Sequence, residues 1–180
     1  MSCSDLTIRR AAPGDWDRVM AVMVDWWAGR DLRPMLPKVF FDHFRSTCLV
    51  AEQGDELVAF LVGFLCPDHP EEAYVHIVGV HPSFRRAGLA HDLYGRFFAV
   101  ALAQGRTVIR AVTAPMNKAS IAFHTGLGFA ILPGDEEVDG VPATLDHGPY
   151  GDYLVHFELR LGESGDGSAL AARPAQEAGR

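Results

Sequence analysis

The stretch VGVHPSFRRAGLA, residues 78–90, joins a predicted strand to a predicted helix. Pro82 ends the strand, because proline lacks the N–H that a central strand needs. The small residues that follow open a helix, whose first N–H groups lack partners within the helix and attract phosphate. Arg85 and Arg86 add positive charge, and Gly88 has no Cβ to obstruct a ligand. These residues fit a phosphate cradle, although tight packing around Gly88 with solvated arginines explains them equally well.

The same stretch matches neither the GxGxxG fingerprint nor the GxxxxGK pattern of a P-loop. An enzyme that uses NAD or ATP is therefore a weaker alternative, which a binding screen with those nucleotides would detect.

The flanking sequence predicts alternating strands and helices. A strand over 73–81 precedes the junction, and the helix over 85–105 carries apolar residues every four positions. Further strands are predicted at 6–9, 46–52, 57–66, 107–113, 129–132 and 151–161, and further helices from Asp15 through Trp27, at 34–44 and at 117–125. Such alternation indicates a mixed α/β sheet covered by helices.

Composition indicates one globular domain. The chain has 180 residues, of which 48% are apolar and 22% charged, which excludes a disordered or fibrous protein. Residues 162–180 are rich in Gly, Ala, Ser and Pro, which predicts a flexible tail after a folded domain over 1–161.

Charge and cysteine content restrict the partners and the compartment. A net charge of −7 disfavours nucleic-acid binding and suits a cationic or amine substrate. The three cysteines form no CxxC, so neither a disulfide framework nor a thiolate zinc site is expected. No signal peptide is evident, and the apolar run 57–66 is too short for the roughly 20 residues of a membrane span. We expect a cytoplasmic protein without a membrane partner.

Two motifs carry a resemblance to a known family. The pattern Arg85-x-x-Gly88-x-Ala90, preceded by Val80-x-Pro82, resembles the acetyl-CoA signature of the GCN5-related N-acetyltransferase (GNAT) superfamily. The later stretch NKASIAFHTGLGF, residues 117–129, resembles a second motif of that family, and the sequence around Ile8 resembles its first strand. The resemblance implies an α/β (α+β) GNAT fold, with a mixed, mostly antiparallel central sheet flanked by helices and splayed between strands 4 and 5.

The resemblance also implies an activity, namely direct transfer of the acetyl group of acetyl-CoA to a primary amine of a small molecule or peptide. The pantetheine arm would enter the splay, where Gly79 suits a β-bulge and the Val80 N–H would polarise the thioester carbonyl. The implied cofactor contacts are Val78, Gly79, Val80, Arg85, Arg86, Ala87, Gly88, Leu89, Ala90, Asn117 and Ser120. A non-catalytic CoA-binding module of the same fold is the alternative, and a homodimer is compatible with either.

Acetyl transfer to an amine needs a base. Strand residues two apart share a face, so Tyr74, His76, Val78 and Val80 would point the same way, subject to the expected bulge. Tyr74 stands where the histone-modifying branch of the family has a Glu, and His76 is the leading replacement, because imidazole is an effective base near neutral pH. A structural histidine is the alternative, as is a water relay through Glu71 or Glu72.

The leaving thiolate benefits from a proton donor. His124 stands seven residues after Asn117, where many family members have a Tyr that acts as the general acid. The alternatives are a surface histidine on the helix, with Tyr94 or Tyr74 as the donor.

Acceptor-site candidates lie on two connecting segments. They are Trp27 and Asp31 on the first and Asp146 and Tyr150 on the second. Trp26 and Phe41, near the first segment, are at least as well explained as core residues. No metal site is expected, because His76 and His81 fall on opposite strand faces and no HExxH occurs.

Overall fold

The computed structural model describes residues 6–146 and 152–162 of the chain. The strands in this part are β1 (Leu6–Arg10), β2 (Leu49–Gln53), β3 (Glu56–Leu65), β4 (Glu72–Val80), β5 (Val108–Thr113), β6 (Ala130–Ile131), β7 (Glu136–Val138), β8 (Val141–Leu145) and β9 (Tyr153–Arg160). The α-helices are α1 (Asp15–Val22), α2 (Val39–His43), α3 (Leu89–Ala103) and α4 (Lys118–Gly126), and the short 3-10 helices are η1 (Asp25–Trp27), η2 (Arg33–Met35) and η3 (Pro82–Phe84).

The strands form one sheet in the order β1-β2-β3-β4-β5-β9-β8-β7, with β6 also paired to β9. All neighbouring strands run antiparallel except β4 and β5, which run parallel. A mixed, mostly antiparallel sheet flanked by helices was expected, and the structure confirms it.

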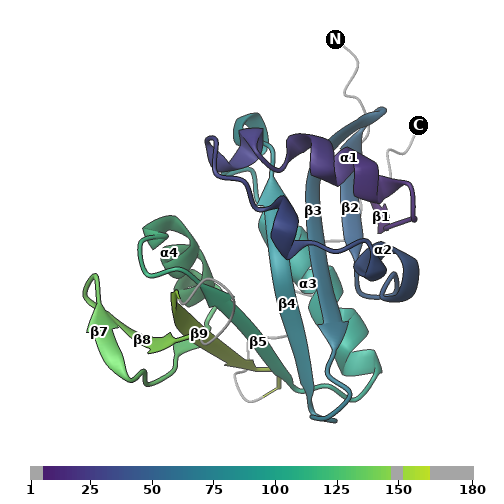
Figure 1. The fold of residues 1–180 in the computed structure, drawn as a ribbon. Helices are drawn as coiled ribbons and strands as arrows, with labels where there is room; N and C mark the ends of the chain where they lie inside the picture. Colours follow the sequence, from purple (N-terminus) through teal and green to yellow (C-terminus); the bar gives the residue numbers. More distant parts are fainter. Residues whose placement is uncertain (1–5, 147–151, 163–180) are drawn as a thin grey trace.

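The sheet opens between β4 and β5. The two strands pair only where Glu72–Val75 lies beside Val108–Ala111, although β4 continues to Val80. Figure 1 shows them adjacent at one end and diverging toward the other. In the described part of the chain, the edge of β4 that faces β5 therefore has no strand partner beyond Val75, which confirms the predicted splay.

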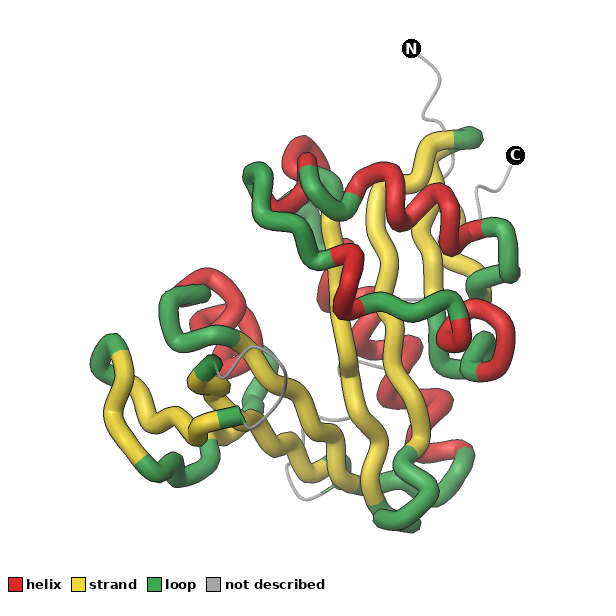
Figure 2. Tube along the Cα trace, in the orientation of Figure 1, coloured by secondary structure: helices red, strands yellow, loops and turns green. Residues whose placement is uncertain are grey.

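Helices cover both faces of the β1–β4 half of the sheet. In Figures 1 and 2, α1 and α2 cross the near face and α3 lies behind it. Behind the sheet, Leu93 and Phe97 of α3 pack with Ile109 in the larger core. In front, Val19 of α1 and Phe41 of α2 pack in a second core. Burial of these apolar faces fixes the helices that surround the opening.

The β-bulge of β4 lies at His76 and not at Gly79. Val62 of β3 pairs with Ile77, but the next residue, Gly63, pairs with Val75, so β4 carries one extra residue. The prediction that Tyr74, His76, Val78 and Val80 share a face is therefore wrong, because a bulge reverses the alternation. Val78 and Val80 pack with Ala73 and Val75 behind the sheet, whereas Tyr74 and His76 stack on aromatic rings in front.

Gly79 serves close packing on the front face. A Cβ at Gly79 would lie 2.6 Å from the Phe60 ring and 2.7 Å from the Trp27 ring. These approaches are shorter than side-chain carbons tolerate, so only glycine lets Trp27 lie against β4.

Several predicted elements have different bounds. The first helix begins at Asp15 as expected but ends at Val22 instead of continuing through Trp27, and its N-cap is Gly14. The segment 34–44 divides into η2 and α2, because Pro37 interrupts it. The hairpin of β7 and β8 was not predicted, since β7 has only three residues, two of them glutamates, and β8 contains Pro142.

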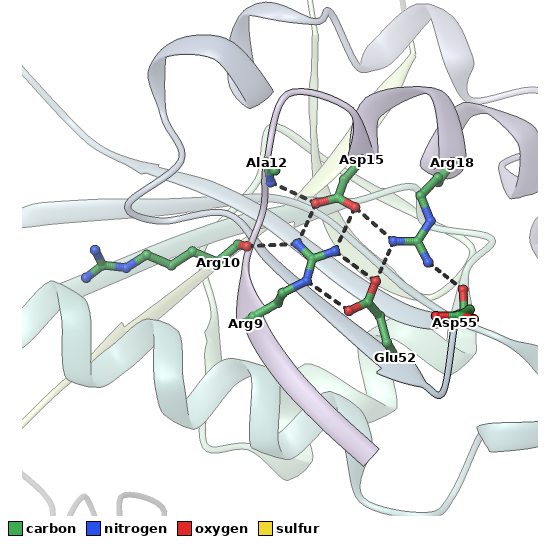
Figure 3. A network of polar contacts seen from close by, with 7 residues as sticks. All are labelled: Arg9, Arg10, Ala12, Asp15, Arg18, Glu52 and Asp55. Atoms are coloured by element: carbon green, nitrogen blue, oxygen red, sulfur yellow. Dashed lines mark hydrogen bonds and ion pairs between the residues drawn. The ribbon is translucent and has the colours of Figure 1, made fainter. Parts of the chain in front are cut away.

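An ion network joins β1, α1 and β2 (Figure 3). Asp15 bridges Arg9 at 2.7 Å and Arg18 at 3.0 Å, and Glu52 contacts both arginines. The Asp15 carboxylate also accepts the Ala12 N–H at 2.7 Å, and its side chain is 4% exposed. Burial raises the pKa of Asp15, but these hydrogen bonds outweigh it, so the net pKa lies below the ordinary value.

We expect Asp15→Asn to lower the free energy of unfolding by about 2 kcal/mol at pH 7, because three hydrogen bonds from the Arg9 and Arg18 guanidinium groups lose their carboxylate acceptor. A carboxyl whose pKa is lowered by folding stabilises the fold above its unfolded pKa, near 4, and that stability is lost as the pH falls through the folded pKa. Urea unfolding between pH 7 and 3 should therefore show a shallower acid loss in the variant. An unchanged pH dependence would contradict this role.

Two further expectations concern a C-terminal tail and a membrane-spanning helix. The predicted tail lies outside the described residues except for Gly162. Within residues 6–146 and 152–162, no helix combines the length and apolar character that a membrane span requires.

Candidate active site

A cleft of about 200 Å³ occupies the opening between β4 and β5. One wall is β4 from Val75 to Val78, and the opposite wall combines the end of β5 with the start of α4. Trp27 of η1 and Met35 of η2 close the front, and Tyr94 of α3 lies at the back. The cleft therefore exists because β4 and β5 stop pairing, and segments distant in sequence enclose it.

His76 lines this cleft from the bulge. Its Nε2 lies 2.6 Å from the carbonyl oxygen of Met35, and its ring stacks on Phe40 with the centroids 4.8 Å apart. A carbonyl only accepts hydrogen bonds, so Nε2 carries the hydrogen and Nδ1 keeps its lone pair. The arrangement fixes the ring and leaves one nitrogen able to accept a proton.

His124 also lines the cleft, but it is a buried residue, 4% exposed, and not a helix-surface histidine. Its Nδ1 donates to the Ser120 carbonyl at 2.8 Å, and its Nε2 lies 2.8 Å from the Tyr94 hydroxyl. Because Nδ1 holds the hydrogen, Nε2 accepts and Tyr94 donates. Burial lowers the pKa of His124, and the bond to Ser120 opposes this only in part. Burial also raises the pKa of Tyr94, so the pair is neutral.

The start of α4 forms the rim on the β5 side. The Asn117 side chain caps the helix by accepting the Ser120 N–H at 3.2 Å, and its amide donates to the Thr113 hydroxyl at 3.2 Å. Asn117 and Ser120 both line the cleft, and their contact with a cofactor stays a prediction.

The N-terminus of α3 is an open backbone turn. Arg86 and Gly88 adopt left-handed conformations, with φ of +66° and +86°, and nothing lies within 4 Å of a Cβ built on Gly88. Gly88 is the N-cap of this 15-residue helix and supplies no side-chain hydrogen bond to its first N–H groups. This geometry can hold an anion, and the cofactor contacts expected over residues 85–90 stay a prediction.

Arg85 lies differently from the residues that follow it. Its guanidinium donates to the Val80 carbonyl at 3.2 Å and to the Trp26 carbonyl. The side chain is thus bonded to the end of β4 and to η1.

The acceptor-site candidates divide into two groups. Trp27 and Asp146 line the cleft, and Tyr150 lies outside the described residues. Asp31 does not line the cleft and instead pairs with Arg33 at 2.7 Å, which lowers the pKa of Asp31 to about 2. Asp152, from the same predicted loop as Asp146, also lines the cleft.

Two other candidates lie away from the cleft. Tyr74 stacks on Phe64 with the centroids 5.3 Å apart, and burial raises its pKa to about 12. Trp26 is 5% exposed and stacks on Phe60, in agreement with the core alternative.

The contact of Met35 with His76 had no sequence signal, because it depends on how residues 33–35 fold back over β4. A metal centre finds no support either, since no group of three His, Cys, Asp or Glu residues converges in the described ranges.

Comparisons with known proteins agree with this geometry. The Acetyltransferase (GNAT) family matches residues 16–129. L-2,4-diaminobutyric acid acetyltransferase from Halalkalibacterium halodurans is 33% identical over 86 residues, which are 48% of this chain and 46% of that protein. The protein of the same name from Vibrio cholerae is 36% identical over 78 residues, 43% of this chain and 45% of that one. The matched segment thus spans about half the length of these relatives.

Solved structures share the fold. Diaminobutyrate acetyltransferase from Paenibacillus lautus, solved with L-2,4-diaminobutyric acid and coenzyme A, superposes with a TM-score of 0.66 at 24% identity, covering 86% of this chain and 95% of that one. An acetyltransferase from Salmonella typhimurium, solved with acetyl-CoA, gives a TM-score of 0.66 at 20% identity, covering 89% and 96%.

Proposed function

Because this chain belongs to the GNAT family of acetyltransferases, we propose that it transfers the acetyl group of acetyl-CoA to a primary amine of a small molecule. The observation that carries the proposal is the cleft at the splay. It places an unpaired edge of β4, the capped start of α4 and the fixed imidazole of His76 around one space.

The cofactor would lie along β4. Its pyrophosphate fits the open N-terminus of α3, where Gly88 leaves room for a close approach. Its pantetheine arm can pair with the free edge of β4 beyond Val75, as an added strand would. Asn117 and Ser120 flank the other side of this path.

His76 is the proposed general base. A primary alkylammonium ion cannot attack a thioester until it loses a proton, and the lone pair of His76 Nδ1 can accept that proton directly or through water. The amine nitrogen then forms a bond to the acetyl carbon, and the carbon–sulfur bond breaks to release the CoA thiolate. The nitrogen loses its second proton as the amide forms, and an equivalent proton converts the thiolate to the CoA thiol.

Transfer without a cysteine intermediate agrees with the thiols in the described residues. Cys48 and Cys66 are both buried, and neither lines the cleft. Burial raises the pKa of Cys48 to about 11 and also raises the pKa of Cys66, so both thiols stay protonated and unreactive near neutral pH.

The acceptor end of the cleft favours an amine with further charge. Asp146 and Asp152 line it together with Arg30, so carboxylates and a guanidinium face the same space. A diamino acid offers ammonium groups to Asp146 and Asp152 and a carboxylate to Arg30. L-2,4-Diaminobutyrate, the substrate that the names of the relatives state, is the first acceptor we propose.

The test measures CoA thiol release from the purified full-length chain with acetyl-CoA and a panel of acceptors. The panel compares L-2,4-diaminobutyrate, ornithine, lysine and putrescine with glycine, which has no side-chain amine. We expect turnover with at least one side-chain amine and a product heavier by one acetyl group. Tight acetyl-CoA binding without thiol release across the panel would favour the non-catalytic module instead.

A further inference from the structure

Arg85 is the first residue of the motif over 85–90, which the cofactor would contact. Its side chain nevertheless lies toward η1, the segment that carries Trp27 and that we call the acceptor wall. The Nε group donates to the Val80 carbonyl at 3.2 Å, and a terminal nitrogen donates to the Trp26 carbonyl. Val80 ends β4, and Trp26 belongs to η1, 59 residues earlier in the chain. One guanidinium therefore joins the end of β4 to η1, the segment whose Trp27 closes the front of the cleft.

Aromatic contacts fix the same joint. Trp26 stacks on Phe60 with the centroids 5.8 Å apart and receives the edge of the His81 ring at 5.7 Å. The next residue, Trp27, reaches the cleft over Gly79. The position of Trp27 thus depends on how firmly η1 is held against the end of β4.

The planar fork of arginine suits this bridge. It presents several N–H donors in fixed directions, so it can hold two carbonyls at once, whereas lysine offers a flexible point charge. In η1, the carbonyls of Asp25 and Trp27 accept from nearby backbone N–H groups, and the Trp26 carbonyl accepts from Arg85. Without Arg85, that carbonyl would lose its bond and η1 its polar tie to β4.

We propose that Arg85 is a positioning residue, which holds the acceptor wall through Trp26 instead of binding the pyrophosphate. The inference rests on the proposed function in taking the Trp27 side of the cleft as the acceptor end. The Arg85 side chain then connects the segment 85–90 to the acceptor wall, while the backbone around Gly88 holds the phosphate.

Three variants test the assignment: Arg85→Ala, Arg85→Lys and, as a matched control on the exposed face of α3, Arg96→Ala. We expect Arg85→Ala to raise the KM for the acceptor about tenfold, while the Kd for CoA changes less than threefold. Acrylamide should quench tryptophan emission more strongly in Arg85→Ala than in Arg96→Ala, because η1 loosens. Arg85→Lys should restore the charge but not the acceptor KM.

The opposite pattern would overturn the assignment. If Arg85→Ala weakens CoA binding more than tenfold, Arg85→Lys restores it, and acceptor KM and quenching stay at the wild-type level, Arg85 is a phosphate ligand. CoA calorimetry and quenching need no turnover, so they decide the role of Arg85 even if the acetyl-transfer proposal fails. If Arg85→Ala does not fold, Arg85→Lys decides between the two roles. If Arg85 is a phosphate ligand, the lysine variant keeps both its CoA affinity and wild-type quenching. If Arg85 is a positioning residue, the lysine variant keeps its CoA affinity but shows stronger quenching.

Discussion

Replacing His76 by alanine should reduce kcat about 100-fold, the usual contribution of a positioned general base, while the Kd for acetyl-CoA changes less than twofold. The ring lies in the cleft beside β4, and its free nitrogen, Nδ1, is the one available to an incoming ammonium. The cofactor would contact the β4 backbone, which this substitution leaves in place. The loss should therefore fall on the chemical step, measured as thiol release under saturating acetyl-CoA.

A second variant separates the base from the structural contact. The amide of His76→Gln places its nitrogen near the position of Nε2 and can still donate to the Met35 carbonyl, but it has no nitrogen lone pair that accepts a proton near neutral pH. If His76 acts as the base, the glutamine variant should be as slow as the alanine variant. If the histidine only holds residues 33–35 against β4, glutamine should restore most of the turnover, and our assignment would be wrong.

The two short motifs, over residues 78–90 and 117–129, predicted more of the site than any other part of the sequence, because each specifies a local backbone structure. A small-residue turn before an apolar helix specifies the open N-terminus at Gly88, and an Asn three residues before a Ser specifies the cap of α4. These local structures form wherever the sheet places them. The alternation of strands and helices then predicted the sheet between them.

What the sequence missed depends on pairing between distant segments. The bulge at His76 follows from the register of β4 against β3, and a shift of one residue moves side chains to the other face. The Trp26 carbonyl that accepts from Arg85 and the Met35 carbonyl that accepts from His76 come from η1 and η2, whose short turns have weak sequence signals. Residue types thus predicted which side chains reach the cleft better than they predicted what holds them there.

The other large effect concerns the buried pair of His124 and Tyr94. His124→Ala should lower the free energy of unfolding by about 3 kcal/mol, because it empties a core site and leaves the Tyr94 hydroxyl without its partner. The imidazole stacks on Phe157 with the centroids 4.7 Å apart and links α4 to α3. Urea unfolding monitored by circular dichroism measures this loss directly.

The lowered pKa of His124 also sets a pH dependence. Folding resists protonation of this ring, whereas the unfolded chain takes up the proton near the ordinary histidine pKa of about 6.5. Stability is therefore complete above about pH 6.5 and falls as the pH drops toward the lower pKa of the folded state. His124→Gln should remove this contribution between pH 7 and 5. A variant with the wild-type slope in that range would contradict the burial argument.

The same pair determines which group can assist the leaving thiolate. The neutral imidazole presents a lone pair at Nε2, so the hydrogen between the two side chains belongs to the Tyr94 hydroxyl. The Tyr94 hydroxyl has one hydrogen, so it can donate to the thiolate sulfur only by turning away from His124 Nε2. Burial raises the pKa of Tyr94, which disfavours full proton transfer but allows this hydrogen bond to sulfur. We therefore expect Tyr94→Phe to lower kcat by about tenfold to 100-fold with little change in acetyl-CoA affinity. If His124 is instead the acid, as the motif over 117–129 suggested, Tyr94→Phe should keep nearly full turnover while His124→Gln loses it.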